Sequence, residues 1–186
     1  MRFKIKGKLM MAFLAIFGIS LIMFGSTYYL TSKQKSDGLL INLAGRQRML
    51  SQKMSKEMLT LIYKRNTDNK QIQKEEKQSL VRTMQVFDRT LDCLINSGSA
   101  PLTLNPEGKS AYIPRAKGKA REQLKKVQSL WNPFQNNLEK IVSGQDGSAS
   151  DYVLENNIAL LKSMDKAVDI LQGQSEEKVS YLLYTQ

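Results

Sequence analysis

An uncharged apolar segment near the N-terminus, from Leu9 to Leu30, constrains the fold more than any other feature of the chain. A helix needs about 20 apolar residues to cross the hydrocarbon core of a bilayer, and this segment is long enough. It is longer than the apolar core of a typical signal peptide, and no small-residue cleavage site follows it. We therefore predict that residues 9–30 form an uncleaved transmembrane signal anchor.

The charges that flank this segment predict its orientation. Residues 1–8 carry four basic side chains, Arg2, Lys4, Lys6 and Lys8. Basic residues stay on the cytoplasmic side of a membrane, so residues 1–8 form a cytoplasmic flank and the remainder lies outside the cytoplasm. We expect the inner membrane to hold the anchor and the periplasm to hold residues 33–186. No second apolar span occurs before Gln186, so the chain is either a one-pass protein or the front part of a longer receptor.

Four helical segments are predicted after the membrane span, over residues 33–65, 70–96, 116–142 and 151–183. Turn-forming residues at 66–69 separate the first two, and loops are expected at 97–114 and 143–150. Pro133 should kink or break the third helix. No window has the short alternating apolar pattern of a strand. The predicted fold class is therefore all-α, an N-terminal transmembrane helix that continues into an antiparallel four-helix bundle.

The first of these helices carries two stripes of unlike composition. At about 100° per residue, one stripe is typical of a bundle core: Leu43, Gln47, Leu50, Met54, Met58 and Leu61. The second consists of small residues with apolar ends and one arginine: Ile41, Ala44, Gly45, Arg48, Ser51, Gln52, Ser55, Leu59 and Ile62. Small residues let two backbones approach closely, and the natural second backbone is the same helix of another subunit about a two-fold axis.

Arg48 in such a homodimer predicts a site for an anion. The two copies of Arg48 would lie near each other, and two buried like charges without counter-ions are costly. A flat oxyanion such as nitrate or a carboxylate fits the planar donor fork of arginine and removes that cost. Gly45, which costs a helix about 1 kcal/mol relative to alanine, would give access to its backbone. In the alternative, Arg46 and Arg48 are ordinary exposed residues of a basic helix.

The stretch INLAGRQRMLSQKMSKE, from Ile41 to Glu57, resembles the signature of the PilJ-type sensor domain, the N-terminal module of type IV pilus-associated methyl-accepting transducers. It is also similar to the nitrate-binding box of nitrate/nitrite sensor kinases, Asn-x-Ala-Gly-x-x-Arg-Met-x-Ser. Six residues meet that pattern: Asn42, Ala44, Gly45, Arg48, Met49 and Ser51. Trp131 with Pro133 and Phe134, and the segment 155–168, are weaker family features.

The resemblance implies a dimeric periplasmic bundle with its ligand between the two first helices. It makes Arg48 the anion-binding arginine, gives Gly45 a backbone contact, and assigns Asn42 and Arg46 a supporting role. Nitrate or a similar small anion is the implied ligand. The Arg46-Gln47 pair stands where the kinase box usually has a small residue and a leucine, a form normal for the PilJ type.

The composition of the chain argues against several other classes of function. The net charge of +11 suits an anionic partner, but the basic residues are spread out and the domain is expected outside the cytoplasm, so nucleic-acid binding is not expected. The chain has no histidine and no glycine-rich phosphate loop, so no enzyme, cofactor or metal site is expected. Asp88 and Asp92, one helical turn apart, could hold a cation, but they are expected to be solvated or paired surface charges. The prediction is a chemoreceptor-type sensor that signals to chemotaxis or kinase partners; the alternative is a membrane-tethered scaffold without ligand sensing.

Overall fold

The computed structural model describes residues 5–65 and 70–184 of the 186-residue chain. The turn expected at 66–69 and the basic residues Arg2 and Lys4 lie outside these ranges. The chain divides into two compact units, Met1–Asp37 and Gly38–Gln186.

The first unit consists, in its described part, of the N-terminal portion of helix α1 (Ile5–Arg65). Its large apolar side chains are exposed, as Phe13 and Phe24 illustrate at 71% and 76%. In the described part of the chain, α1 is the one helix long and apolar enough to cross a membrane. A helix that is apolar all round suits a lipid environment.

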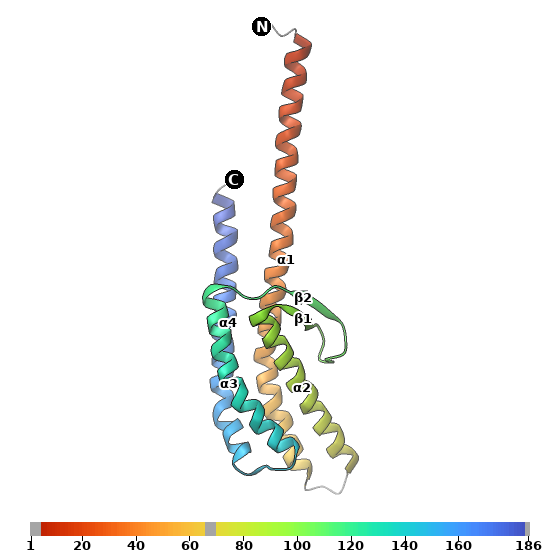
Figure 1. The fold of residues 1–186 in the computed structure, drawn as a ribbon, viewed down its shortest axis with the longest axis vertical. Coiled ribbons are helices and arrows are strands. Elements are labelled where there is room, and N and C mark those ends of the chain that lie inside the picture. Colours follow the sequence, from red (N-terminus) through yellow and green to blue (C-terminus); the bar gives the residue numbers. More distant parts are fainter. Residues whose placement is uncertain (1–4, 66–69, 185–186) are drawn as a thin grey trace. The chain divides into compact units, whose positions relative to one another are not determined.

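The second unit is a bundle of the C-terminal part of α1 with helices α2 (Lys70–Asn96), α3 (Gly118–Val142) and α4 (Gly147–Tyr184) (Figure 1). Side-chain hydrogen bonds join each neighbouring pair: Gln47 to the Phe87 carbonyl, Trp131 to Asp88, Gln123 to the Ser163 carbonyl, and Arg48 to Asp165. Residue numbers rise along one helix as they fall along its neighbour, so successive helices are antiparallel. This confirms the predicted all-α fold class.

Apolar side chains from all four helices fill the centre of the bundle. At the α2–α3 contact, the Trp131 and Phe87 ring centroids lie 4.3 Å apart, and the indole Nε1 donates to the Asp88 carboxylate at 2.9 Å. Trp131 is only 1% exposed. A tilted aromatic pair of this kind contributes about 0.5–1.5 kcal/mol beyond its buried area. The hydrogen bond to Asp88 satisfies the buried indole N–H of Trp131.

The segment predicted as a loop between α2 and α3 contains a small antiparallel hairpin. Strand β1 (Gly98–Pro101) pairs with β2 (Ser110–Ile113), with Gly98 opposite Ile113 and Pro101 opposite Ser110. The loop prediction was wrong for these residues because each strand is only four residues long, too short for an alternating pattern to register. The hairpin adds no layer to the bundle.

The start and end of α3 and the start of α4 lie within four residues of the predicted positions. Helix α3 passes through Pro133 without a break, although the proline ring removes one backbone donor. It ends where Gly144, at φ +95°, lets Gln145 donate to the Lys140 carbonyl, which closes the last turn. Helix α4 begins at Gly147, four residues earlier than predicted, so the second half of the expected loop is helical.

Candidate anion-binding site

The inner face of α1 is the core stripe that the sequence predicts. Its six members are all buried, at 3% exposure or less: Leu43, Gln47, Leu50, Met54, Met58 and Leu61. The one polar member, Gln47, donates to the Phe87 carbonyl of α2 at 3.2 Å. This part of the prediction is confirmed, because a repeat of three and four residues keeps one side of a helix against its neighbours.

The predicted second stripe is partly wrong. Ala44, Ser51 and Ser55 are 0%, 0% and 5% exposed, so these small residues face the interior of this chain's own bundle. A helix in a four-helix bundle contacts two neighbours, and its buried arc is therefore wider than the core stripe alone. On a helical wheel with Leu43 at zero, that arc extends to about 120°, where these three residues lie. They are not available to a second subunit.

The residues that α1 does present outward recur at alternating intervals of three and four. We call them the outer stripe of α1; each is exposed or half-buried: Asn42, Gly45, Met49, Gln52, Lys56, Leu59 and Tyr63. Met49 and Leu59 are each 48% exposed and Tyr63 is 70% exposed. A repeat averaging 3.5 residues is the spacing along which two helices pack side by side.

Gly45 occupies the outer stripe with open space beside it. A methyl group added at this position would meet no atom of the chain within 4 Å. Glycine is therefore not required here by any contact inside the described bundle, although it weakens a helix by roughly 1 kcal/mol relative to alanine. If glycine is needed at this position, the contact that requires it is made with another molecule rather than within this chain.

Arg48 lies on the border between the buried arc and the outer stripe. Its Nη1 donates to Oδ1 of Asp165 on α4 at 2.8 Å, and the two side chains are 47% and 41% exposed. Within α1, the Ser51 hydroxyl donates to the Arg48 carbonyl at 2.8 Å. The guanidinium is thus held beside α4 at the surface, where a small anion from solvent has access to it.

Arg46 points to the other side of the helix. Its Nη2 donates to the Pro101 carbonyl of β1 at 2.5 Å and lies 3.4 Å from the Thr90 hydroxyl of α2. Partial burial lowers the pKa of its guanidinium from the ordinary value. The structure does not bring Arg46 and Arg48 together, whereas Asn42, Gly45 and Arg48 share the outward side of α1.

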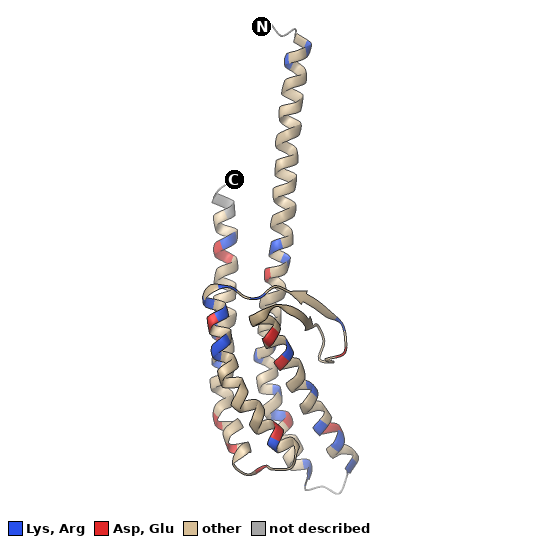
Figure 2. Cartoon of the chain, in the orientation of Figure 1, with Lys and Arg blue, Asp and Glu red and all other residues tan. Residues whose placement is uncertain are grey.

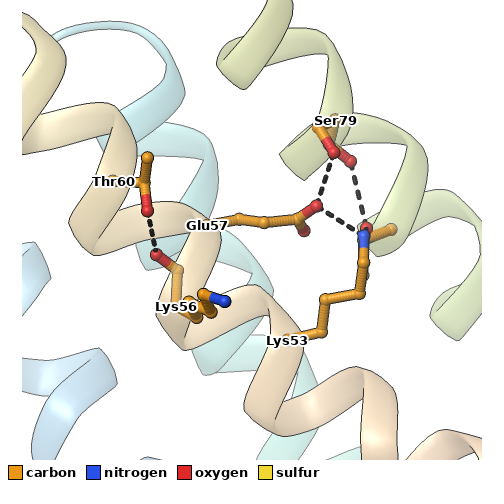
Figure 3. Close-up of polar contacts among 6 residues, drawn as sticks. Lys53, Lys56, Glu57, Thr60 and Ser79 are labelled. Atoms are coloured by element: carbon orange, nitrogen blue, oxygen red, sulfur yellow. Dashed lines mark hydrogen bonds and ion pairs between the residues drawn. The ribbon is translucent and has the colours of Figure 1, made fainter.

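A polar cluster between α1 and α2 was missed by the sequence reasoning (Figure 3). Glu57, 8% exposed, accepts from Lys53 Nζ and from the Ser79 hydroxyl, each at 2.5 Å. Lys53 also donates to the Thr83 hydroxyl at 2.8 Å. The i,i+4 spacing of Lys53 and Glu57 was the available signal; the partners on α2 had none.

Figure 2 shows Lys and Arg distributed over all four helices of the second unit rather than gathered on one of them. Among the residues the structure describes, no three side chains are placed to hold a metal ion. Asp88 accepts from Trp131 and Asp92 accepts from Asn96, so each carboxylate already has a protein donor.

Comparisons with known proteins place the chain among families and solved structures. The family described as "Type IV pili methyl-accepting chemotaxis transducer N-term" (PilJ) matches residues 29–156. A comparison with curated protein sequences finds no match. Among solved structures, the ligand-binding domain of the P. aeruginosa nitrate receptor McpN is similar at 23% identity and a TM-score of 0.49, covering 73% of this chain and 94% of that one.

Proposed function

The chain belongs to the PilJ family of chemotaxis transducer N-terminal domains, and from that premise we propose that it senses a small oxyanion, nitrate foremost, at a homodimer interface. The sensor is anchored by residues 9–30, with residues 1–8 in the cytoplasm and the bundle in the periplasm. It carries out no catalysis and needs no cofactor. Its output passes to chemotaxis or kinase partners.

The observation that carries this proposal is the place of Arg48. It combines an accessible guanidinium, half-exposed at the surface, with the motif that resembles the nitrate-binding box. A planar guanidinium presents parallel N–H donors that match two oxygens of a flat oxyanion. Arg46, held against the Pro101 carbonyl, is not assigned to the first contact with the anion.

The outer stripe of α1 supports the dimer. Two copies packed along Met49, Gln52, Lys56 and Leu59 would bury apolar side chains that a single chain leaves half-exposed. Gly45 would then lie at the meeting point, where the absence of a side chain lets the second backbone approach. An anion between the two Arg48 side chains would accept hydrogen bonds from both guanidinium groups and so link the two subunits.

Ligand binding then becomes a signal through helix packing. An anion that bridges two subunits favours the packing in which both guanidinium groups reach it, and shifts the equilibrium by that difference in affinity. Helix α1 contains both Arg48 and the apolar membrane segment. A change in the packing of α1 is therefore the expected output.

Calorimetric titration of the full chain in detergent tests the function. We expect saturable binding of sodium nitrate by the wild-type protein, no comparable heat with sodium chloride, and loss of the nitrate response in Arg48→Ala with helicity unchanged. Absence of heat and of any thermal shift at millimolar nitrate would reject the ligand. A dimer that forms through α1 but ignores oxyanions would instead favour the scaffold function.

A further inference from the structure

Asp165 is the carboxylate partner of the proposed anion-binding arginine, and the sequence gives no hint of it. The two residues are 117 positions apart, yet Oδ1 of Asp165 lies 2.8 Å from Nη1 of Arg48. In the described part of the chain, no other carboxylate forms an ion pair with Arg48. The pair joins α1 to α4 at the level of the candidate site.

A carboxylate and nitrate compete for the same donors. Both are flat monoanions that accept hydrogen bonds through oxygen, and the guanidinium fork fits either. The contact with Asp165 engages Nη1. An anion that binds through the pair of parallel donors that includes Nη1 must therefore replace the carboxylate there. Both side chains are more than 40% exposed, so water and ions reach the pair, and such pairs are weak.

In an assembled dimer, the two Asp165 carboxylates would lower the net positive charge of the site that the anion enters. Two Arg48 and two Asp165 side chains sum to zero, so the ligand-free interface carries no uncompensated pair of arginines. Binding one monovalent anion leaves the group with one excess negative charge unless the carboxylates move away. Without the carboxylates, the same anion would enter a site of charge +2, which attracts it more strongly.

We infer that Asp165 is an intramolecular competitor of the anion: it neutralises Arg48 in the ligand-free protein and is displaced on binding. This inference rests on the proposed anion-sensing function and deepens it. Displacement releases the tie between α1 and α4 at this level, so α4 also responds to the ligand. Asp165 thereby sets the concentration range in which the sensor works.

The test is nitrate titration of full-length Asp165→Asn in detergent, beside the wild type. We expect Asp165→Asn to bind nitrate about threefold to tenfold more tightly, as loss of a weak competing pair in each subunit implies. Asp165→Glu, which keeps the charge, should restore wild-type affinity to within about twofold. Asp169→Asn is the matched control, because Asp169 is exposed one turn further along α4 and its replacement changes the net charge equally.

Each outcome separates the two claims. If Arg48→Ala abolishes binding but Asp165→Asn binds no more tightly than Asp169→Asn, the competitor role is wrong and the sensing function stands. Weaker binding by Asp165→Asn would also overturn the inference, because it would mean that Asp165 positions Arg48 for the ligand. If the wild type does not bind nitrate, or Arg48→Ala binds equally well, the proposed function fails and the inference fails with it.

Discussion

Two ion pairs on helix α1, Lys53–Glu57 facing inward and Arg48–Asp165 facing outward, differ chiefly in burial. The inner cluster consists of Lys53 and Glu57 with Ser79 and Thr83, and the Glu57 side chain is 10% exposed. The outer pair consists of Arg48 and Asp165, whose carboxylate side chain is 41% exposed. The chemistry of the charged groups is similar; the access of water is not.

This difference in burial suggests that the inner cluster stabilises the fold and that the outer pair takes part in ligand binding. A buried carboxylate must keep its donors, because an unpaired buried charge is costly, so the inner cluster ties α1 to α2. An exposed pair contributes only about 0–1 kcal/mol to stability, so its partners can be exchanged for ions from solvent at little cost. The outer pair therefore suits ligand exchange, and the inner cluster suits a fixed interface.

The largest effect that sharpens this comparison is expected from Glu57→Ala. Loss of the carboxylate leaves the Ser79 hydroxyl without its acceptor and leaves Lys53 without its ion pair, although Lys53 keeps the Thr83 hydroxyl. We expect the free energy of unfolding to fall by about 2–3 kcal/mol. Urea unfolding followed by the fluorescence of Trp131, the single tryptophan, measures it. Glu155→Ala, at an exposed position of α4, is the control and should change stability by less than about 0.5 kcal/mol. Equal losses in both variants would remove the distinction between the two regions.

Arg46→Ala is expected to cost less than Glu57→Ala and more than Arg48→Ala. The substitution leaves the carbonyl of the buried Pro101 without its donor, which costs about 1–2 kcal/mol. The same unfolding experiment measures the loss. Nitrate affinity in this variant tests the supporting role that the family resemblance implies: lost binding by a folded Arg46→Ala protein would assign Arg46 to the ligand site after all.

Gly45→Ala is expected to affect the stability of the bundle and the stability of the dimer in opposite directions. Because nothing lies within 4 Å of an added methyl group, we expect the isolated bundle to gain about 0.5–1 kcal/mol of stability from the better helix former. We also expect the dimer to weaken, which sedimentation of the detergent-solubilised protein measures. Gly173→Ala, on α4 with equally open surroundings, should bring the stability gain without the loss of dimer. An unchanged dimer in Gly45→Ala would argue against close packing at this position.

Arg48→Ala should have the smallest effect on stability. Its ion pair is exposed and screened, so the unfolding free energy is expected to change by less than about 1 kcal/mol. Urea unfolding measures the free energy of unfolding of the variant and the wild type in low and in high sodium chloride. High salt screens exposed ion pairs, so the difference between the two proteins should shrink. A loss of 2 kcal/mol or more would place Arg48 with the inner cluster, as a residue that holds the fold.

The sequence predicted the features that depend on local periodicity. The end of α2 at Asn96 and the end of α3 at Val142 match the prediction, because apolar spacing and turn residues act over a few positions. The buried serines and alanine of α1 were misplaced because the width of the buried arc depends on how many helices surround it. The pairing of Arg48 with Asp165 depends on the register of two helices far apart in sequence, which no local pattern contains.

A structure of the assembled dimer determined in the presence of nitrate tests the central claim most directly. We expect a flat, three-oxygen ligand within hydrogen-bonding distance of Arg48 from both subunits, with the outer stripes of the two α1 helices in contact and Asp165 withdrawn. A dimer in which Arg48 faces open solvent, away from the partner subunit and without a bound anion, would contradict the account.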